Sequence, residues 1–245
     1  MRFWLSLTSS GPLKLPHDYN HAVQSLIYRM LSPDFSKFLH EAGFTVGKRS
    51  FKLFTFSRLL GRYVVNGAEI VFKPPMRLCI SSPVERFVME AVNGFLSNGK
   101  VYLYGEELKV TALELPERPQ INDKILCRTL SPITVYSTLI MGDGRKKTYY
   151  YSPFEDEFSD IISKNLVKKI QALTGKELKG YVSIKPHQGS RPREHIHVFK
   201  GTVIKSWSGT YEIQGSPELI TMGYEAGIGS KNSQGFGMIE VIKHA

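Results

Sequence analysis

Apolar residues three and four positions apart, the spacing of one helix face, recur along the chain. The longest such tracts are residues 84–95 and 154–170, and shorter ones occur at 20–31, 33–42 and 219–225. A Ser-Pro pair precedes four of the five tracts, at Ser32, Ser82, Ser152 and Ser216. Serine is a favoured N-cap and proline suits the first helical position, so each pair predicts a helix start.

Segments rich in β-branched and aromatic residues flank these helices. The predicted strands are residues 3–7, 52–57, 63–72, 77–81, 101–113, 125–136, 180–184, 195–203 and 237–242. The order is strand, helix, strands, helix, strand, and it occurs twice. This order predicts an α+β protein of two tandem ferredoxin-like domains, the fold of RNA-recognition motifs. We expect domains at 1–117 and 122–245, with the proline-containing segment 116–124 as the linker.

The formal net charge of +10 and pI of about 9.5 favour a polyanionic partner. An acidic membrane surface would also suit this charge, but the sequence has neither an apolar run of 18 residues nor a long basic amphipathic helix. The first residues alternate like a half-buried strand and are too short for a signal-peptide core, so we expect a cytoplasmic protein. Cys79 and Cys127 lack metal-site spacing and are expected to be buried and reduced.

Four glycines, Gly227, Gly229, Gly235 and Gly237, lie within eleven residues near the C-terminus. Such a cluster suits positive backbone φ or the close approach of another backbone, and a nucleic-acid strand is one such backbone. Walker A and dinucleotide loops run from strand to helix, whereas this loop runs from helix to strand. There is also no Gly-Lys-Ser/Thr, and Asn232 stands where a dinucleotide loop needs glycine. A nucleotide pocket is therefore not expected.

This pattern, with Lys231, Asn232 and Ser233 between the glycine pairs, resembles the C-terminal signature of CRISPR-associated endoribonucleases of the RAMP superfamily. These enzymes cut precursor CRISPR RNA within its repeats. The glycine-rich loop, residues 227–237, would then bind RNA through the four glycines and the three polar residues. The implied partner is CRISPR repeat RNA, with a CRISPR effector complex as a further candidate, no cofactor, and a monomeric or homodimeric chain.

A second set of residues resembles one branch of the same family: Tyr28 in the first helix, Leu39-His40 in the next, and Lys52 before Leu-Phe-Thr. The resemblance extends to residues 129–133 and implies catalytic roles for Tyr28, His40 and Lys52. In RNA cleavage the 2′-hydroxyl is the nucleophile, so the enzyme needs proton transfer and charge stabilisation but no metal. Histidine suits proton transfer, lysine supplies charge, and tyrosine suits hydrogen bonding.

Each residue of this trio also has an ordinary structural interpretation. Tyr28 could be a helix-surface aromatic, His40 a residue favoured by a helix C-terminus, and Lys52 a solvated strand end. His21 shares a helix face with Tyr28 and could assist the site or only pack. A non-catalytic RNA-binding subunit of the same architecture is therefore the alternative function.

Other basic and imidazole groups offer further candidates. Lys185 and Arg193 are expected to contact RNA phosphates, because they flank strands. The basic runs at 145–147, 168–169 and 191–193 could also contact phosphates, and each could equally be a solvated face. His195 and His197 share a strand face near His187, which suggests a metal-dependent phosphohydrolase as a third class. No carboxylate or cysteine completes such a metal set in the sequence pattern.

Overall fold

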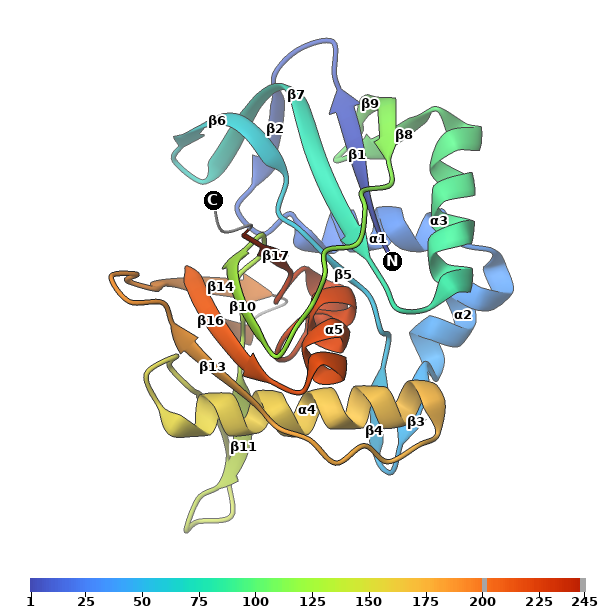
Figure 1. Cartoon of the computed structure of the whole chain (residues 1–245). Coiled ribbons are helices and arrows are strands. Elements are labelled where there is room, and N and C mark those ends of the chain that lie inside the picture. Colours follow the sequence, from blue (N-terminus) through green and yellow to red (C-terminus); the bar gives the residue numbers. More distant parts are fainter. Residues whose placement is uncertain (200–201, 243–245) are drawn as a thin grey trace. The chain divides into compact units, whose positions relative to one another are not determined.

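The computed structural model describes residues 1–199 and 202–242 (Figure 1). These residues form two compact units. Unit 1 contains residues 1–118 and the short segment 233–235. Unit 2 contains residues 119–232 and the described residues from Phe236 on. Each unit is built around its own antiparallel sheet.

Unit 1 has one large sheet of order β2-β7-β1-β9-β8, with β5 and β6 also pairing to β7, and a separate β3-β4 hairpin. Its strands are β1 (Arg2–Thr8), β2 (Leu13–Pro16), β3 (Phe44–Val46), β4 (Arg49–Phe51), β5 (Thr55–Phe56), β6 (Leu60–Asn66), β7 (Glu69–Ser81), β8 (Lys100–Leu103) and β9 (Glu106–Glu114). Its helices are α1 (Asn20–Arg29), α2 (Pro33–Glu41) and α3 (Glu85–Asn98). The inner order β9-β1-β7-β6 is that of a ferredoxin-like sheet, as the sequence predicts.

The core of unit 1 follows directly from the period-two pattern of β1. Phe3, Leu5 and Leu7 are fully buried, and Leu5 lies opposite Leu78 of β7 on one side. Helices α1 and α3 contact this sheet and contribute to the same core cluster. The two helices approach closely at Gly94, where a Cβ atom would lie only 2.4 Å from the Met30 carbonyl oxygen.

Unit 2 has a sheet of order β13-β16-β10-β17, again ferredoxin-like, and two separate hairpins, β11-β12 and β14-β15. Its strands are β10 (Lys124–Thr129), β11 (Tyr136–Ile140), β12 (Lys146–Tyr150), β13 (Val182–Pro186), β14 (Arg193–Phe199), β15 (Thr202–Ser208), β16 (Thr210–Gly215) and β17 (Ile239–Val241). Its helices are α4 (Asp156–Thr174) and α5 (Pro217–Ala226), and a 3₁₀ turn spans Asn232–Gln234. Helices α4 and α5 pack against one another (Figure 1).

Several predicted strands were wrong because each merges two structural segments. Residues 63–72 and 101–113 each form a hairpin, in which Gly67 and Gly105 adopt positive φ at the turn. Residues 125–136 contain β10 and only the start of β11. The segment 195–203 covers parts of β14 and β15, and its residues 200–201 lie outside the described residues. A two-residue turn barely interrupts an apolar pattern, so the pattern continues through it.

The Ser-Pro rule was correct for two helices and wrong for two. Ser32 and Ser216 are the N-cap residues of α2 and α5, each followed by proline. At Ser82 and Ser152 the helix begins later, so that Val84 and Glu155 occupy the N-cap position. There the serine hydroxyl accepts a backbone N–H two residues on and forms a short turn ahead of the helix.

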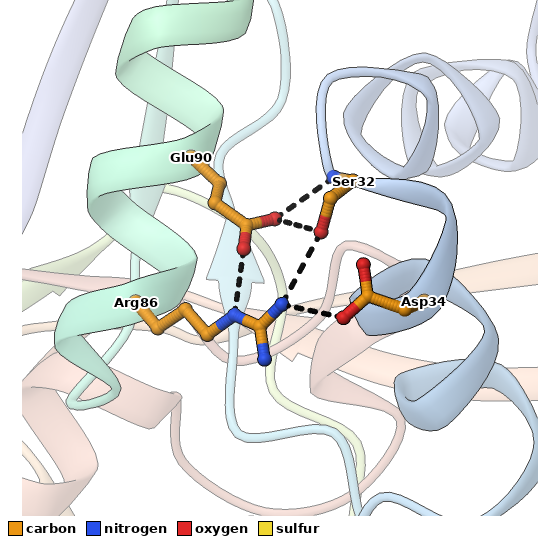
Figure 2. A network of polar contacts seen from close by, with 4 residues as sticks. All are labelled: Ser32, Asp34, Arg86 and Glu90. Atoms are coloured by element: carbon orange, nitrogen blue, oxygen red, sulfur yellow. Dashed lines mark hydrogen bonds and ion pairs between the residues drawn. The ribbon is translucent and has the colours of Figure 1, made fainter.

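A polar network joins the start of α2 to α3 in unit 1 (Figure 2). Glu90 accepts hydrogen bonds from the backbone N–H and the hydroxyl of Ser32, both at 2.8 Å. Arg86 donates to Glu90 at 2.6 Å and to Asp34 at 2.7 Å. Burial alone would raise the pKa of Glu90, but the bonds from Arg86 and Ser32 lower it. The network therefore fixes the start of the helix that contains His40.

Both cysteines are buried, as expected, and they are not joined in a disulfide bond. Burial raises the pKa of the Cys127 thiol to about 12, so this thiol stays protonated at neutral pH. Within the described residues, no helix is both long and apolar enough to cross a membrane.

Candidate functional site

Tyr28, His40 and Lys52 come together in unit 1. The rings of Tyr28 and His40 meet edge to face with their centroids 6.3 Å apart. The Lys52 ammonium donates a hydrogen bond to the backbone carbonyl of His40 at 3.0 Å. Tyr28 also packs edge to face on Phe54, at 5.7 Å between centroids. Three side chains separated by up to 24 sequence positions thus form one cluster, which we call the Tyr-His-Lys cluster.

Two residues with positive φ shape the chain around Lys52. Gly43, just after α2, has φ +64°, and a Cβ atom there would lie 2.6 Å from the Phe51 carbonyl oxygen. Glycine therefore lets the β3-β4 hairpin pack closely against the end of α2. Leu53 has φ +51°, a conformation that bulky residues adopt rarely and that often occurs at functional sites. The predicted strand start at Lys52 was wrong, because Lys52 lies between β4 and β5.

The three side chains differ in ionisation and exposure. Burial raises the pKa of the Tyr28 hydroxyl to about 12, so Tyr28 remains a neutral hydrogen-bond donor at physiological pH. Burial also lowers the pKa of Lys52. His40 is exposed, so its imidazole is accessible to a substrate. The cluster combines a proton-transfer group, a cation and a neutral donor, which suits phosphodiester cleavage through a 2′-hydroxyl.

His21 belongs to a different set of contacts in unit 1. Its Nδ1 lies 2.9 Å from the Asp18 carbonyl oxygen, and its Nε2 lies 3.3 Å from the Tyr104 hydroxyl. Because a carbonyl only accepts, Nδ1 must donate, and a neutral His21 ring then accepts from Tyr104 at Nε2. Tyr104 has φ +50° in the turn between β8 and β9.

The glycine-rich loop is a tightly packed segment. All four of its glycines have positive φ, between 74° and 85°. A Cβ atom at Gly229 would lie 2.5 Å from the Thr134 carbonyl oxygen, and one at Gly237 would lie 1.9 Å from that of Ile228. The backbone that approaches these two glycines is therefore the protein's own.

The tip of this loop, Ser233 to Gly235, belongs to unit 1. The side-chain amide of Asn20 donates to the carbonyl oxygens of Gln234 at 3.0 Å and Gly235 at 3.3 Å. A Cβ atom at Gly235 would lie 2.5 Å from the Phe56 ring. Substitution of Gly235 would therefore disturb packing as well as any RNA contact.

The polar residues of the loop have different surroundings. Lys231 has φ +58°, its ammonium lies 5.5 Å from the centre of the Tyr136 ring, and burial lowers its pKa. Asn232 is buried and donates to the carbonyls of Ile228 and Phe236, both at 3.0 Å. Ser233 is partly exposed. Lys231 and Ser233 are thus more accessible than Asn232.

Sequence reasoning missed the role of Lys169, a residue of α4. The 168–169 lysine pair was expected either to contact phosphates or to form a solvated helix face, and both alternatives are wrong for Lys169, because its side chain is buried. Its ammonium donates to the carbonyls of Gly227 at 2.7 Å and Gly229 at 3.4 Å and to Oδ1 of Asn232 at 2.7 Å. Burial lowers the pKa of Lys169 to about 7. Adjacent lysines usually indicate a solvated helix face, so nothing in the sequence indicated that Lys169 is buried under the loop.

The remaining candidates lie on the surface of unit 2. Lys185 on β13 is exposed and lines a pocket of about 540 Å³ between α4 and β13. Arg193, at the start of β14, is also exposed. The rings of His195 and His197 stack at 6.2 Å, as their shared strand face predicts. Within residues 1–199 and 202–242, no three metal-binding side chains lie close enough to hold an ion.

The two ferredoxin-like units and the glycine-rich loop agree with two family models of CRISPR-associated proteins. The family model "CRISPR associated protein Cas6, C-terminal" matches residues 115–241, more than half of the chain. The model "CRISPR-associated protein Cas6, N-terminal" matches residues 14–114. The chain therefore belongs to the Cas6 family.

Similar proteins match over nearly their whole length. CRISPR-associated endoribonuclease Cas6 1 of Methanocaldococcus jannaschii is 29% identical, with 98% of this chain and 92% of the relative covered. CRISPR-associated endoribonuclease Cas6 of Pyrococcus furiosus is 27% identical, with 98% and 90% covered. A solved structure described as "CRISPR associated protein Cas6" is 28% identical, with a TM-score of 0.80 and 99% of each chain covered.

Proposed function

We propose that this protein is a metal-independent endoribonuclease that cleaves precursor CRISPR RNA within its repeats. The 2′-hydroxyl attacks the adjacent phosphate, leaving a 2′,3′-cyclic phosphate and a 5′-hydroxyl. The meeting of Tyr28, His40 and Lys52 in one cluster carries the proposal. The Cas6 family membership and the relatives named endoribonucleases support it.

In this mechanism His40 transfers the proton, because its side chain is exposed and imidazole is the group that most often serves as a general acid or base. It takes the proton of the 2′-hydroxyl or gives one to the departing 5′-oxygen. Lys52 neutralises negative charge that develops on the phosphorane oxygens. Tyr28 stays protonated and orients the RNA or the imidazole by hydrogen bonding.

RNA binding is assigned to the glycine-rich loop and to exposed cations of unit 2. Lys231 and Ser233 are partly exposed in the loop, and Lys185 and Arg193 are exposed on the strands. Phosphate contacts by such cations release counterions, so affinity should fall steeply with salt. The four glycines set the conformation in which the loop presents its polar residues.

A modified substrate tests the chemistry. A repeat RNA with a single 2′-deoxy sugar upstream of the scissile phosphate should bind with unchanged affinity and resist cutting. The unmodified RNA should be cut in excess EDTA, and its product should carry a 2′,3′-cyclic phosphate. Cleavage of the deoxy substrate, or a strict requirement for Mg²⁺ or Mn²⁺, would eliminate the proposed mechanism.

Replacement of His40 tests the assignment of the site. His40→Ala should slow single-turnover cleavage by roughly 10²-fold or more, the usual range for losing a general acid or base, while RNA affinity changes little. His17→Ala is the matched control, because His17 is also exposed in unit 1, where its Nε2 lies 3.2 Å from the Gly67 carbonyl oxygen. Equal cleavage rates for the two variants would move the active site elsewhere, with His21 the next residue to test. Repeat binding by a wild-type protein that never cuts would favour the non-catalytic subunit.

A further inference from the structure

A buried lysine lies under the glycine-rich loop in unit 2. Lys169 is 2% exposed, yet its ammonium has three acceptors: the carbonyls of Gly227 and Gly229 and the side-chain oxygen of Asn232. A methionine of similar length would fill this space without the cost of burying an amine. The contacts with the loop are therefore the physical reason for a lysine at this position.

Asn232 extends this network to the rest of the loop. Its side-chain oxygen accepts from Lys169, and its side-chain nitrogen donates to the carbonyls of Ile228 and Phe236. Lys169 and Asn232 together therefore satisfy carbonyl oxygens at both ends of the loop. These oxygens face into the unit, where they cannot repel a phosphate group.

We propose that Lys169 is a positioning residue for RNA binding, which holds the glycine-rich loop in its RNA-competent conformation without touching RNA. The inference rests on the proposed function, because it assigns the loop to repeat RNA. A loop fixed before binding loses less conformational entropy when RNA arrives, so preorganisation increases affinity. Lys231 lies within the fixed segment, so its orientation depends on the same network.

Lys169→Met tests the proposal, with Lys164→Met as the matched control on the same helix. Lys164 is exposed and lines a surface groove of unit 2. Lys169→Met should weaken repeat-RNA affinity roughly tenfold or more, because it leaves buried loop carbonyls without a donor. The slope of log affinity against log salt should stay unchanged, since Lys169 neutralises no phosphate. Removal of a lysine that contacts a phosphate would instead make that negative slope shallower by about 0.7 to 0.9.

Two further measurements separate positioning from a general loss of stability. The single-turnover rate at saturating RNA should stay near that of the wild type, because the Tyr-His-Lys cluster lies in unit 1. Hydrogen exchange should become faster in a peptide spanning residues 226–238 and remain unchanged in a peptide covering β16. Faster exchange in both peptides would show global destabilisation and overturn the proposal.

The outcomes for this inference and for the proposed function differ. Equal RNA affinity of the Lys169→Met and Lys164→Met proteins would overturn the positioning role, as would a reduced salt slope for Lys169→Met. A wild-type protein that binds no repeat RNA would refute the proposed function itself. The hydrogen-exchange comparison needs no RNA, so it would still show whether Lys169 holds the loop.

Discussion

Replacing Gly237 by alanine should destabilise unit 2 far more than the same change at Gly144. Both glycines have nearly equal positive φ, +75° at Gly237 and +79° at Gly144. An alanine in this region costs about 1–2 kcal/mol at either position. Only Gly237 is also crowded: a Cβ atom would lie 1.9 Å from the Ile228 carbonyl oxygen, whereas at Gly144 nothing lies within 4 Å.

The additional loss at Gly237 can be worked out from the contacts that must move. Displacing Ile228 disturbs its N–H bond to the Gly237 carbonyl at 2.8 Å and the bond from Asn232 to its carbonyl at 3.0 Å. Each is worth about 1 kcal/mol, and overpacking adds about 1–3 kcal/mol. We therefore expect a loss of about 4 kcal/mol or more for Gly237→Ala, against about 1–2 kcal/mol for Gly144→Ala.

Urea unfolding can measure this difference in unit 2 alone. The chain has two tryptophans, Trp4 in unit 1 and the buried Trp207 in unit 2. In a Trp4→Phe background, tryptophan fluorescence therefore reports the unfolding of unit 2. A difference of less than about 0.5 kcal/mol between the two losses in unfolding free energy, which is the usual size of a surface effect, would refute the close-packing argument.

Three further predictions follow from the described contacts. Tyr28→Phe should slow cleavage less than His40→Ala, and the double variant should be no slower than His40→Ala alone, because the groups serve one transition state; additive losses would contradict this. The pKa of Lys169 is about 7 in the folded protein and near 10.5 in its ordinary state, so the folded protein binds fewer protons than the unfolded one. The free energy of unfolding of unit 2 should therefore rise by about 2 kcal/mol from pH 7 to pH 9. In urea titrations at both pH values, Lys169→Met should remove this increase. Glu90→Ala should destabilise unit 1 by about 1–2 kcal/mol, because Ser32 loses its hydrogen-bond acceptor. The control Asn93→Ala, on the exposed face of α3, should change stability by less than about 0.5 kcal/mol. Equal shifts in melting temperature for the two variants would exclude a stabilising network.

The helices and the sheet order could be predicted from sequence because both depend on local periodicity and on the order of elements. The tract at 84–95 corresponds to α3 (Glu85–Asn98), and the tract at 154–170 to α4 (Asp156–Thr174). Hairpins were harder to predict, because a turn such as that at Gly67 occupies only two residues of a continuous apolar pattern. Helix starts at Ser82 and Ser152 failed because serine also forms short turns outside a helix.

The site illustrates what a sequence pattern leaves open. Tyr28, His40 and Lys52 could be identified from the sequence as candidate site residues. Their catalytic roles remain a prediction. Their proximity depends on the unusual backbone at Gly43 and Leu53, which no periodicity reveals. The contacts of Lys169 with the loop could not be predicted, because the sequence does not show which of two adjacent lysines is buried.

The pairing of β17 with β10 makes the closure of unit 2 a late event in folding. The backbone N–H of Met238 donates to the Ser131 hydroxyl across 107 positions of sequence. Contacts of such separation form slowly, because a long loop must close before they stabilise the chain. At a synthesis rate of about 5–20 residues per second, β10 waits about 5–20 s for its partner strand. We therefore expect a nascent chain to leave both edges of β10 unpaired until β16 has been synthesised, and one edge unpaired until β17 follows.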